Sequence, residues 1–85
     1  MRITFIPHYP KSTTWYHPCV NGKKMDVDIT FGEFEDIPYH CNCNLYDISH
    51  KLLAYMSIPA VKGREKEALD ALKPIIRHTL KGLGY

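Results

Sequence analysis

The sequence has no long hydrophobic run, little net charge and few cysteines. No stretch approaches the about 18 consecutive apolar residues of a membrane span, and no basic segment followed by an apolar one opens the chain. The formal charge of +2, from 11 basic and 9 acidic residues, is too small to indicate nucleic-acid binding. Three cysteines, an odd number, favour a reducing compartment. We therefore expect a cytoplasmic protein without a membrane partner.

Motifs typical of enzymes are also missing. The sequence has no glycine-rich phosphate loop, no serine nucleophile elbow and no two-histidine metalloprotease motif. A chain of 85 residues leaves little room for a deep pocket. With 45% hydrophobic and 24% charged residues, it has the balance of a folded domain. These observations predict a single small globular domain over residues 1–85 that is not an enzyme.

The first third of the chain is typical of β-structure. Residues 2–6 and 13–20 are rich in β-branched and aromatic side chains, and Asn21 with Gly22 predicts a two-residue hairpin turn. Residues 23–31 alternate apolar and polar side chains, so one face packs and the other is solvated. A bulge or an edge strand is expected near Pro18, because proline has no N–H for the ladder.

The turn also predicts the register of the hairpin. In the simplest pairing, residues whose numbers sum to 43 face each other, so His17 lies opposite Asp26 and Cys19 opposite Lys24. Trp15 then faces Asp28 on the solvated side of the hairpin.

Helices are expected in the second half. Asn44 and Asp47 resemble a helix start, and apolar residues recur at spacings of three and four, which predicts a helix to about residue 57. The alternative takes Leu52 to Val61 as a fourth strand, because that stretch is short and apolar. Residues 64–81 carry a continuous apolar stripe and predict a firmer helix.

The expected fold class is α+β, with about three antiparallel strands packed on two C-terminal helices in the order β-β-β-α-α. Residues 32–43 lack a sustained period and are expected to be a connecting loop. The apolar faces of these elements predict the following core: Ile3, Phe5, Val27, Ile29, Leu52, Leu69, Leu72, Ile76 and Leu80.

Two groups of side chains are candidate metal ligands. His17, Cys19, Cys41 and Cys43 offer nitrogen and sulfur atoms for zinc, although their spacing is tighter than in common zinc knuckles. The simpler alternative is that the cysteines are small buried residues, with no cofactor. A second group consists of acidic residues: Asp26, Asp28, Glu33 and Glu35. They would suit a divalent ion in a small metal-dependent nuclease. The alternative is that they only form the solvated face of a strand.

Aromatic residues are numerous for so small a core, and amphipathic rings favour recognition surfaces. We therefore expect a binding surface on the solvated face of the hairpin and on the segment after it. Its candidate residues are Trp15, His17, Asp26, Asp28, Phe34 and Tyr39.

Residues 15–24, with an aromatic pair and an Asn-Gly-Lys turn, resemble the three-stranded DNA-binding domain of phage-type tyrosine integrases. The resemblance implies a nucleic-acid-binding sheet. It does not extend to a family assignment, because Asp26 and Asp28 stand where such a sheet needs Arg or Lys. The basic residues that would contact phosphates are Lys23, Lys24, Lys73, Arg77 and Lys81.

Together these features predict a small non-enzymatic binding protein. We expect a regulator or inhibitor that covers a site on a larger protein or nucleoprotein, as accessory proteins of phages and mobile elements often do. A DNA- or RNA-binding module, with or without zinc, is the second hypothesis, and the metal-dependent nuclease is the third.

Overall fold

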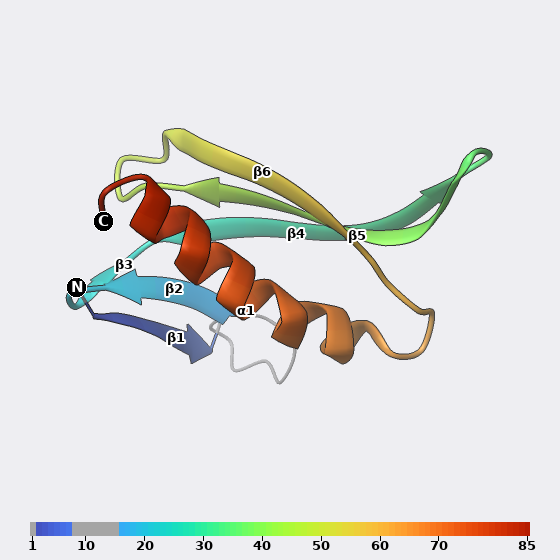
Figure 1. Ribbon diagram of the computed structural model, residues 1–85, viewed down its shortest axis with the longest axis horizontal. Coiled ribbons are helices and arrows are strands. Elements are labelled where there is room, and N and C mark those ends of the chain that lie inside the picture. The colour runs from blue at the N-terminus through green and yellow to red at the C-terminus, as the bar shows by residue number, and fades with distance from the viewer. Residues whose placement is uncertain (1, 8–15) are drawn as a thin grey trace.

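The computed structural model describes residues 2–7 and 16–85, and this part of the chain forms six strands and one helix. One antiparallel sheet has the order β1-β2-β3 and consists of β1 (Ile3–Pro7), β2 (Tyr16–Val20) and β3 (Lys23–Lys24). The second has the order β4-β5-β6 and consists of β4 (Asp26–Phe34), β5 (Ile37–Tyr46) and β6 (Leu52–Pro59). The helix α1 (Glu65–Gly82) packs on β5 and β6 (Figure 1).

The expected fold class is therefore wrong in the second half of the chain. Within the described ranges the order is β-β-β-β-β-β-α, not three strands followed by two helices. Residues 32–43, expected as a loop, complete β4 and begin β5. Residues 44–57, expected as a helix, instead form the end of β5, a turn and most of β6. The alternative that took Leu52 to Val61 as a strand is the correct one.

The helix prediction fails because Asp47 closes a turn and does not cap a helix. Its Oδ1 accepts hydrogen bonds from the N–H groups of Ser49, at 2.8 Å, and Lys51, at 2.9 Å. His50 has a φ of 62°, a left-handed conformation that a right-handed helix cannot contain. The apolar repeat is accidental, since Ile48 and Leu52 are 60% and 54% exposed, and Leu52 is not a core residue.

The turn of the first hairpin forms as predicted, but the return strand expected over residues 23–31 is shorter, because β3 ends at Lys24 and β4 pairs with β5 instead of β2. Asn21 and Gly22 have φ values of 50° and 84°, as a hairpin turn of this type requires, and Cys19 pairs with Lys24. The N–H of Met25 still donates to the carbonyl of Pro18 at 2.8 Å, but the strand is interrupted there. The chain then leaves the first sheet and enters the second as β4, so the expected irregularity near Pro18 is the junction between the sheets.

The core lies between α1 and the inner face of the second sheet. β5 is the central strand, and its inward residues Cys41, Cys43 and Leu45 have no exposed surface. Of the predicted core, Ile3 and Phe5 are only partly buried at its margin. The other confirmed members are buried: Val27, Ile29, Leu69, Leu72, Ile76 and Leu80.

The C-terminal helix is close to its predicted range, and Pro74 lies inside it. Arg64 at its N-terminus makes no side-chain capping bond. Instead the Glu65 carboxylate accepts the N–H of Gly63 at 3.1 Å, and this backbone hydrogen bond is the main reason that the pKa of Glu65 is lowered. No helix in the described ranges is both long enough and apolar enough to cross a membrane.

Leu72→Ala is expected to lower the free energy of unfolding by about 2–5 kcal/mol, because Leu72 is 1% exposed and its truncation leaves a cavity. Ile75→Ala, on the same helix at a position 36% exposed, is the matched control and should cost clearly less. Urea unfolding followed by circular dichroism measures both. Equal losses would mean that α1 packs through a different stripe.

Candidate binding face

The side of the second sheet that faces away from α1 is not covered by any described element. The antiparallel register aligns its outward side chains in rows across β4, β5 and β6. We call the residues of three successive rows the open face. The rows are Asp26, Tyr46 and Leu52; Asp28, Asn44 and Tyr55; and Thr30, Asn42 and Ser57.

Hydrogen bonds between rows hold the two tyrosines of the open face in place. The Tyr46 hydroxyl donates to Oδ2 of Asp28 at 3.2 Å, and the Tyr55 hydroxyl donates to Oδ1 of Asn42 at 2.7 Å. Desolvation, and next the hydrogen bond to Asp28, raise the pKa of Tyr46 above its usual value. Preorganised rings of this kind lose little side-chain entropy when a partner covers them.

The open face is mostly polar and carries little charge. Tyrosine, asparagine, serine and threonine dominate it, and its only charges are the carboxylates of Asp26 and Asp28. Tyrosine supplies rigid contact area, and small polar side chains supply adaptable hydrogen bonds. Because the open face contains no lysine or arginine, it cannot neutralise phosphates.

The open face continues into the β4–β5 hairpin, which extends past the N-terminal end of α1 (Figure 1). Phe34 and Ile37 flank its turn and are 70% and 49% exposed, and the turn itself consists of Glu35 and Asp36. The Phe34 ring lies 5.9 Å from the ring of His40, between centres, on the side of the open face. The hairpin thus presents apolar anchors beside acidic residues.

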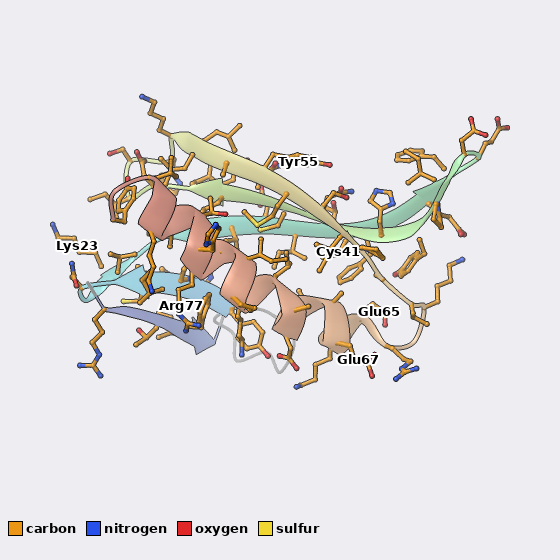
Figure 2. The ribbon with its side chains drawn as sticks, viewed as in Figure 1. Lys23, Cys41, Tyr55, Glu65, Glu67 and Arg77 are labelled. Atoms are coloured by element: carbon orange, nitrogen blue, oxygen red, sulfur yellow. The ribbon has the colours of Figure 1, made fainter. Side chains whose placement is uncertain are left out.

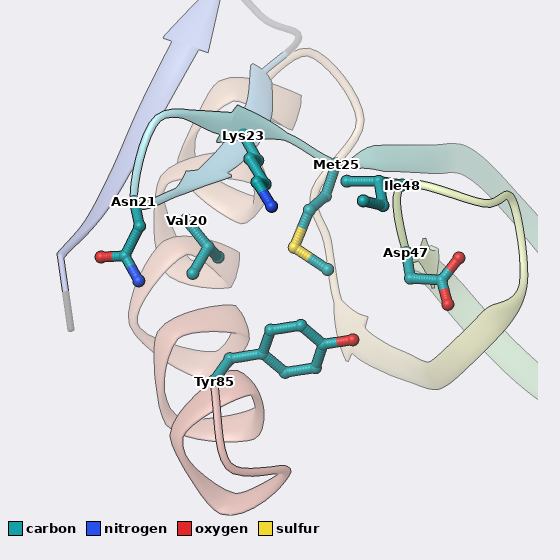
Figure 3. A pocket seen from close by; sticks show the side chains of 7 residues that line it. All are labelled: Val20, Asn21, Lys23, Met25, Asp47, Ile48 and Tyr85. Atoms are coloured by element: carbon teal, nitrogen blue, oxygen red, sulfur yellow. The ribbon is translucent and has the colours of Figure 1, made fainter.

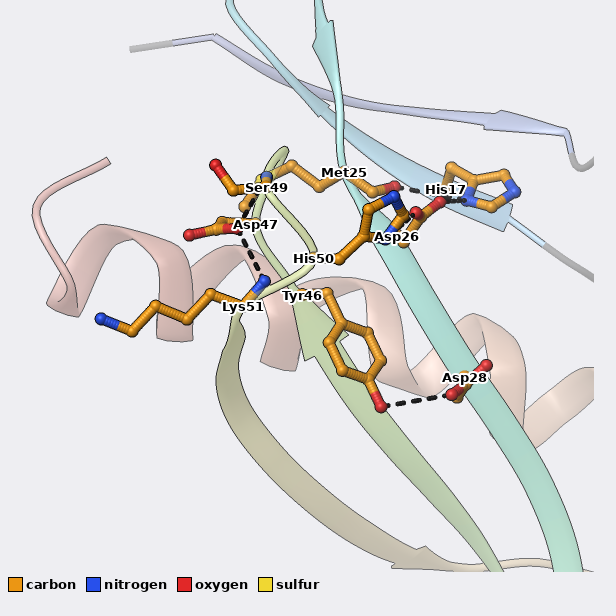
Figure 4. A network of polar contacts seen from close by, with 9 residues as sticks. All are labelled: His17, Met25, Asp26, Asp28, Tyr46, Asp47, Ser49, His50 and Lys51. Atoms are coloured by element: carbon orange, nitrogen blue, oxygen red, sulfur yellow. Dashed lines mark hydrogen bonds and ion pairs between the residues drawn. The ribbon is translucent and has the colours of Figure 1, made fainter.

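Asp26 connects the two sheets at the other end of the open face. Its Oδ1 lies 3.6 Å from Nδ1 of His17 on β2, and its Oδ2 lies 3.0 Å from Nδ1 of His50 in the β5–β6 turn (Figure 4). His17 is 5% exposed, and its Nδ1 also lies 3.3 Å from the carbonyl oxygen of Met25. The predicted facing of His17 and Asp26 is confirmed. His17 serves this junction and is too buried to contact a partner.

Tyr39 lies on the other side of the sheet from the open face. Its ring stacks on Phe31 at 5.9 Å between centres, and its hydroxyl donates to Oε1 of Glu65 at 3.2 Å. Lys62 lies 5.6 Å from the centre of the Tyr39 ring and forms an ion pair with Glu33. Tyr39 therefore fixes the base of the hairpin to the start of α1 and does not share a surface with Asp28.

No protein-family model, curated protein or solved structure matches this chain.

Of the predicted binding residues, Asp26, Asp28 and Phe34 lie on one side of the sheet. Trp15 lies outside the described residues. Residues that the sequence analysis missed carry most of the open face. A signal for them exists, since residues 40–46 alternate strictly between polar and apolar side chains, which is typical of a half-buried strand. The missed residues are Thr30, Asn42, Asn44, Tyr46, Leu52, Tyr55 and Ser57.

The candidate metal ligands are not gathered. Cys41 and Cys43 point into the core, and the described residues contain no group of three or more His, Cys, Asp or Glu side chains placed to hold a metal ion. The acidic candidates are also divided. Asp28 bonds Tyr46 on the open face, whereas Glu33 pairs with Lys62 near α1.

The basic candidates lie elsewhere. Lys73 is 3.8 Å from the centre of the Tyr16 ring, and Arg77 is 5.3 Å from that of Phe5, so both cations cover aromatic rings of the first sheet. Lys23, Lys24 and Lys81 are exposed. Figure 2 shows Lys23 and Arg77 well apart from Tyr55. The chain thus separates an acidic surface on the second sheet from a basic one near the first.

A cavity of about 290 Å³ opens between the hairpin turn of the first sheet and the β5–β6 turn (Figure 3). Val20, Met25 and Ile48 give it apolar walls, Lys23 lies at its side, and the Tyr85 ring closes it. Its size is at the lower limit of small-molecule sites, and two of its polar residues, Asn21 and Asp47, already accept hydrogen bonds from backbone N–H groups.

The buried thiols are expected to be unreactive. Burial raises the pKa of Cys41 to about 11 and that of Cys43 to about 12, so at pH 8 less than about one part in a thousand is thiolate. In the native protein a disulfide reagent should titrate the half-buried Cys19 first, and the other two only as the protein unfolds or as the pH approaches their pKa values. Rapid reaction of all three at pH 8 would contradict this arrangement.

Proposed function

We propose that this chain is a small non-enzymatic binding protein, a regulator or inhibitor that covers a site on a larger protein or nucleoprotein. The observation that carries the proposal is the open face, a solvated sheet surface of tyrosines and small polar side chains that ends in a hairpin with exposed Phe34 and Ile37. The three unpaired cysteines agree with a reducing cytoplasm as its place of action.

The charges of this surface define the partner. Every charge on the open face is negative, and the adjoining turn adds Glu35 and Asp36. The complementary partner surface is basic, with an apolar recess for Phe34. A groove in which a nucleic-acid-binding protein holds its nucleic acid has this character, and an accessory protein of a phage or mobile element would act by occupying it.

The second candidate is direct nucleic-acid binding through the basic surface. It is favoured by Lys23, Lys24 and Lys81, which form no ion pair within the described part of the chain. The first candidate would use the acidic residues of the open face, and the second would use these lysines. Variants that change one set of charges therefore distinguish the two candidates.

Capture from a nuclease-treated host lysate should yield a partner that the Asp28→Lys, Asn44→Lys double variant loses, with a weakening of at least about tenfold. Both positions lie on the open face, and the substitutions place positive charge against a basic partner. Ala71→Lys, on the exposed side of α1, is the matched control and should retain the partner. Melting temperatures should stay close to that of the wild type for all variants.

The Lys23→Glu, Lys24→Glu double variant tests the second candidate. It should leave partner capture unchanged, and the wild type should not shift labelled DNA or RNA at physiological salt. If these two substitutions abolish binding, and if binding disappears steeply between low and moderate salt, the nucleic-acid candidate replaces the first.

A further inference from the structure

The cavity beside the first hairpin is a second surface of the protein, since none of its lining residues belongs to the open face. Val20 and Met25, both buried, form its deepest part. Ile48 in the β5–β6 turn is 60% exposed and stands at its side. With a volume of about 290 Å³, the cavity has room for an apolar group of about the size of one aromatic ring.

The end of α1 holds the Tyr85 ring over this cavity. Gly84 has a φ of 89°, a left-handed conformation that glycine adopts without strain. The N–H of Gly84 donates to the carbonyl of Lys81 at 3.1 Å, and that of Tyr85 to the carbonyl of Leu80 at 3.0 Å. These two hydrogen bonds define a Schellman motif, so the backbone that carries the Tyr85 ring is fixed to the helix.

The two groups nearest the centre of the cavity favour an aromatic ligand. Figure 3 shows the thioether of Met25 reaching into the space between Val20 and the Tyr85 ring. Thioethers make favourable contacts with aromatic rings, and aromatic rings pack well against each other. A ligand ring placed between Met25 and Tyr85 would make both contacts.

The polar groups around the cavity favour an anion. Figure 3 shows the Lys23 ammonium pointing toward the thioether of Met25, whereas the Asp47 carboxylate points away from it. Asp47 is also engaged in its own turn through Oδ1. The Oδ1 atom of Asn21 accepts the N–H of Arg2 at 3.0 Å, so the amide group of Asn21 can offer its NH₂ donor to the cavity.

We propose that this cavity binds a small aromatic carboxylic acid, with the ring between Met25 and Tyr85 and the carboxylate at Lys23. The charge of Lys23 suits this role, because Lys23 forms no ion pair among residues 2–7 and 16–85. The ammonium lies at the mouth of the cavity, so the apolar contacts supply most of the affinity and the charge supplies selectivity. The site does not depend on the proposed function.

Nuclear magnetic resonance of protein labelled with ¹³C in the methionine methyl groups tests the proposal, with 3-phenylpropionate as the probe. The signal of Met25 should shift in a saturable manner, with a Kd of about 1 mM, as is usual for so small a ligand. The signal of Met56 on β6 should stay in place, because Met56 does not line the cavity. The neutral 3-phenylpropanamide should bind more weakly than the acid.

Variants separate the charge from the apolar walls. Lys23→Glu should weaken binding of 3-phenylpropionate at least about tenfold and leave binding of the amide unchanged, because it places a like charge beside the carboxylate. Lys24→Glu is the matched control, with the same change of net charge at an exposed position that does not line the cavity, and should keep the affinity within about twofold. Ile48→Ser should weaken binding of both compounds.

Four results overturn the proposal. They are a Met25 signal that does not move up to about 20 mM probe, equal shifts of Met25 and Met56, an amide that binds the wild type as tightly as the acid does, and equal losses in the two lysine variants. Melting temperatures of all three variants should stay close to that of the wild type, since the substituted side chains are exposed.

Discussion

The structure depends on the burial of one strand between others. β5 pairs with β4 on one side and β6 on the other, and α1 covers its inner residues Cys41, Cys43 and Leu45, which have no exposed surface. Apolar burial contributes about 25 cal/mol per Å², so a domain with a thin core needs a fully covered central strand. Because α1 occupies that side, the opposite side of the same strand remains in water and carries Asn42, Asn44 and Tyr46.

The two ends of the open face are fixed by different physics. At the junction of the sheets, Asp26 lies between the imidazoles of His17 and His50, so the first sheet and the β5–β6 turn share one carboxylate. At the hairpin, Tyr39 is held by stacking and by a hydrogen bond to Glu65 on the helix. Polar contacts hold one end, and aromatic contacts the other. The surface between them is thus anchored at both ends.

Local chemistry predicted part of this fold. The Asn21-Gly22 turn, the facing of His17 and Asp26, and the helix stripe through Leu72 follow from periods and turn preferences within a few residues. The structure of the second half could not be predicted in this way, because an aspartate such as Asp47 closes a backbone turn as readily as it caps a helix. Which of the two forms depends on how the segments before and after it are buried. Asp28 and Phe34 were expected at the binding surface. Their neighbours Asn44 and Tyr55 were not, since cross-strand proximity requires the register of β5 and β6.

The place of α1 in the chain has a consequence during synthesis. Every strand of the second sheet precedes residue 60, whereas the helix that covers the inner face of that sheet begins at Glu65. Ribosomes add about 5–20 residues per second, so Val27, Cys43 and Leu45 stay uncovered for on the order of a second after their strands can pair. In that interval the inner face of the sheet is exposed apolar surface, so we expect aggregation rather than unfolding to limit the yield of variants that weaken the helix.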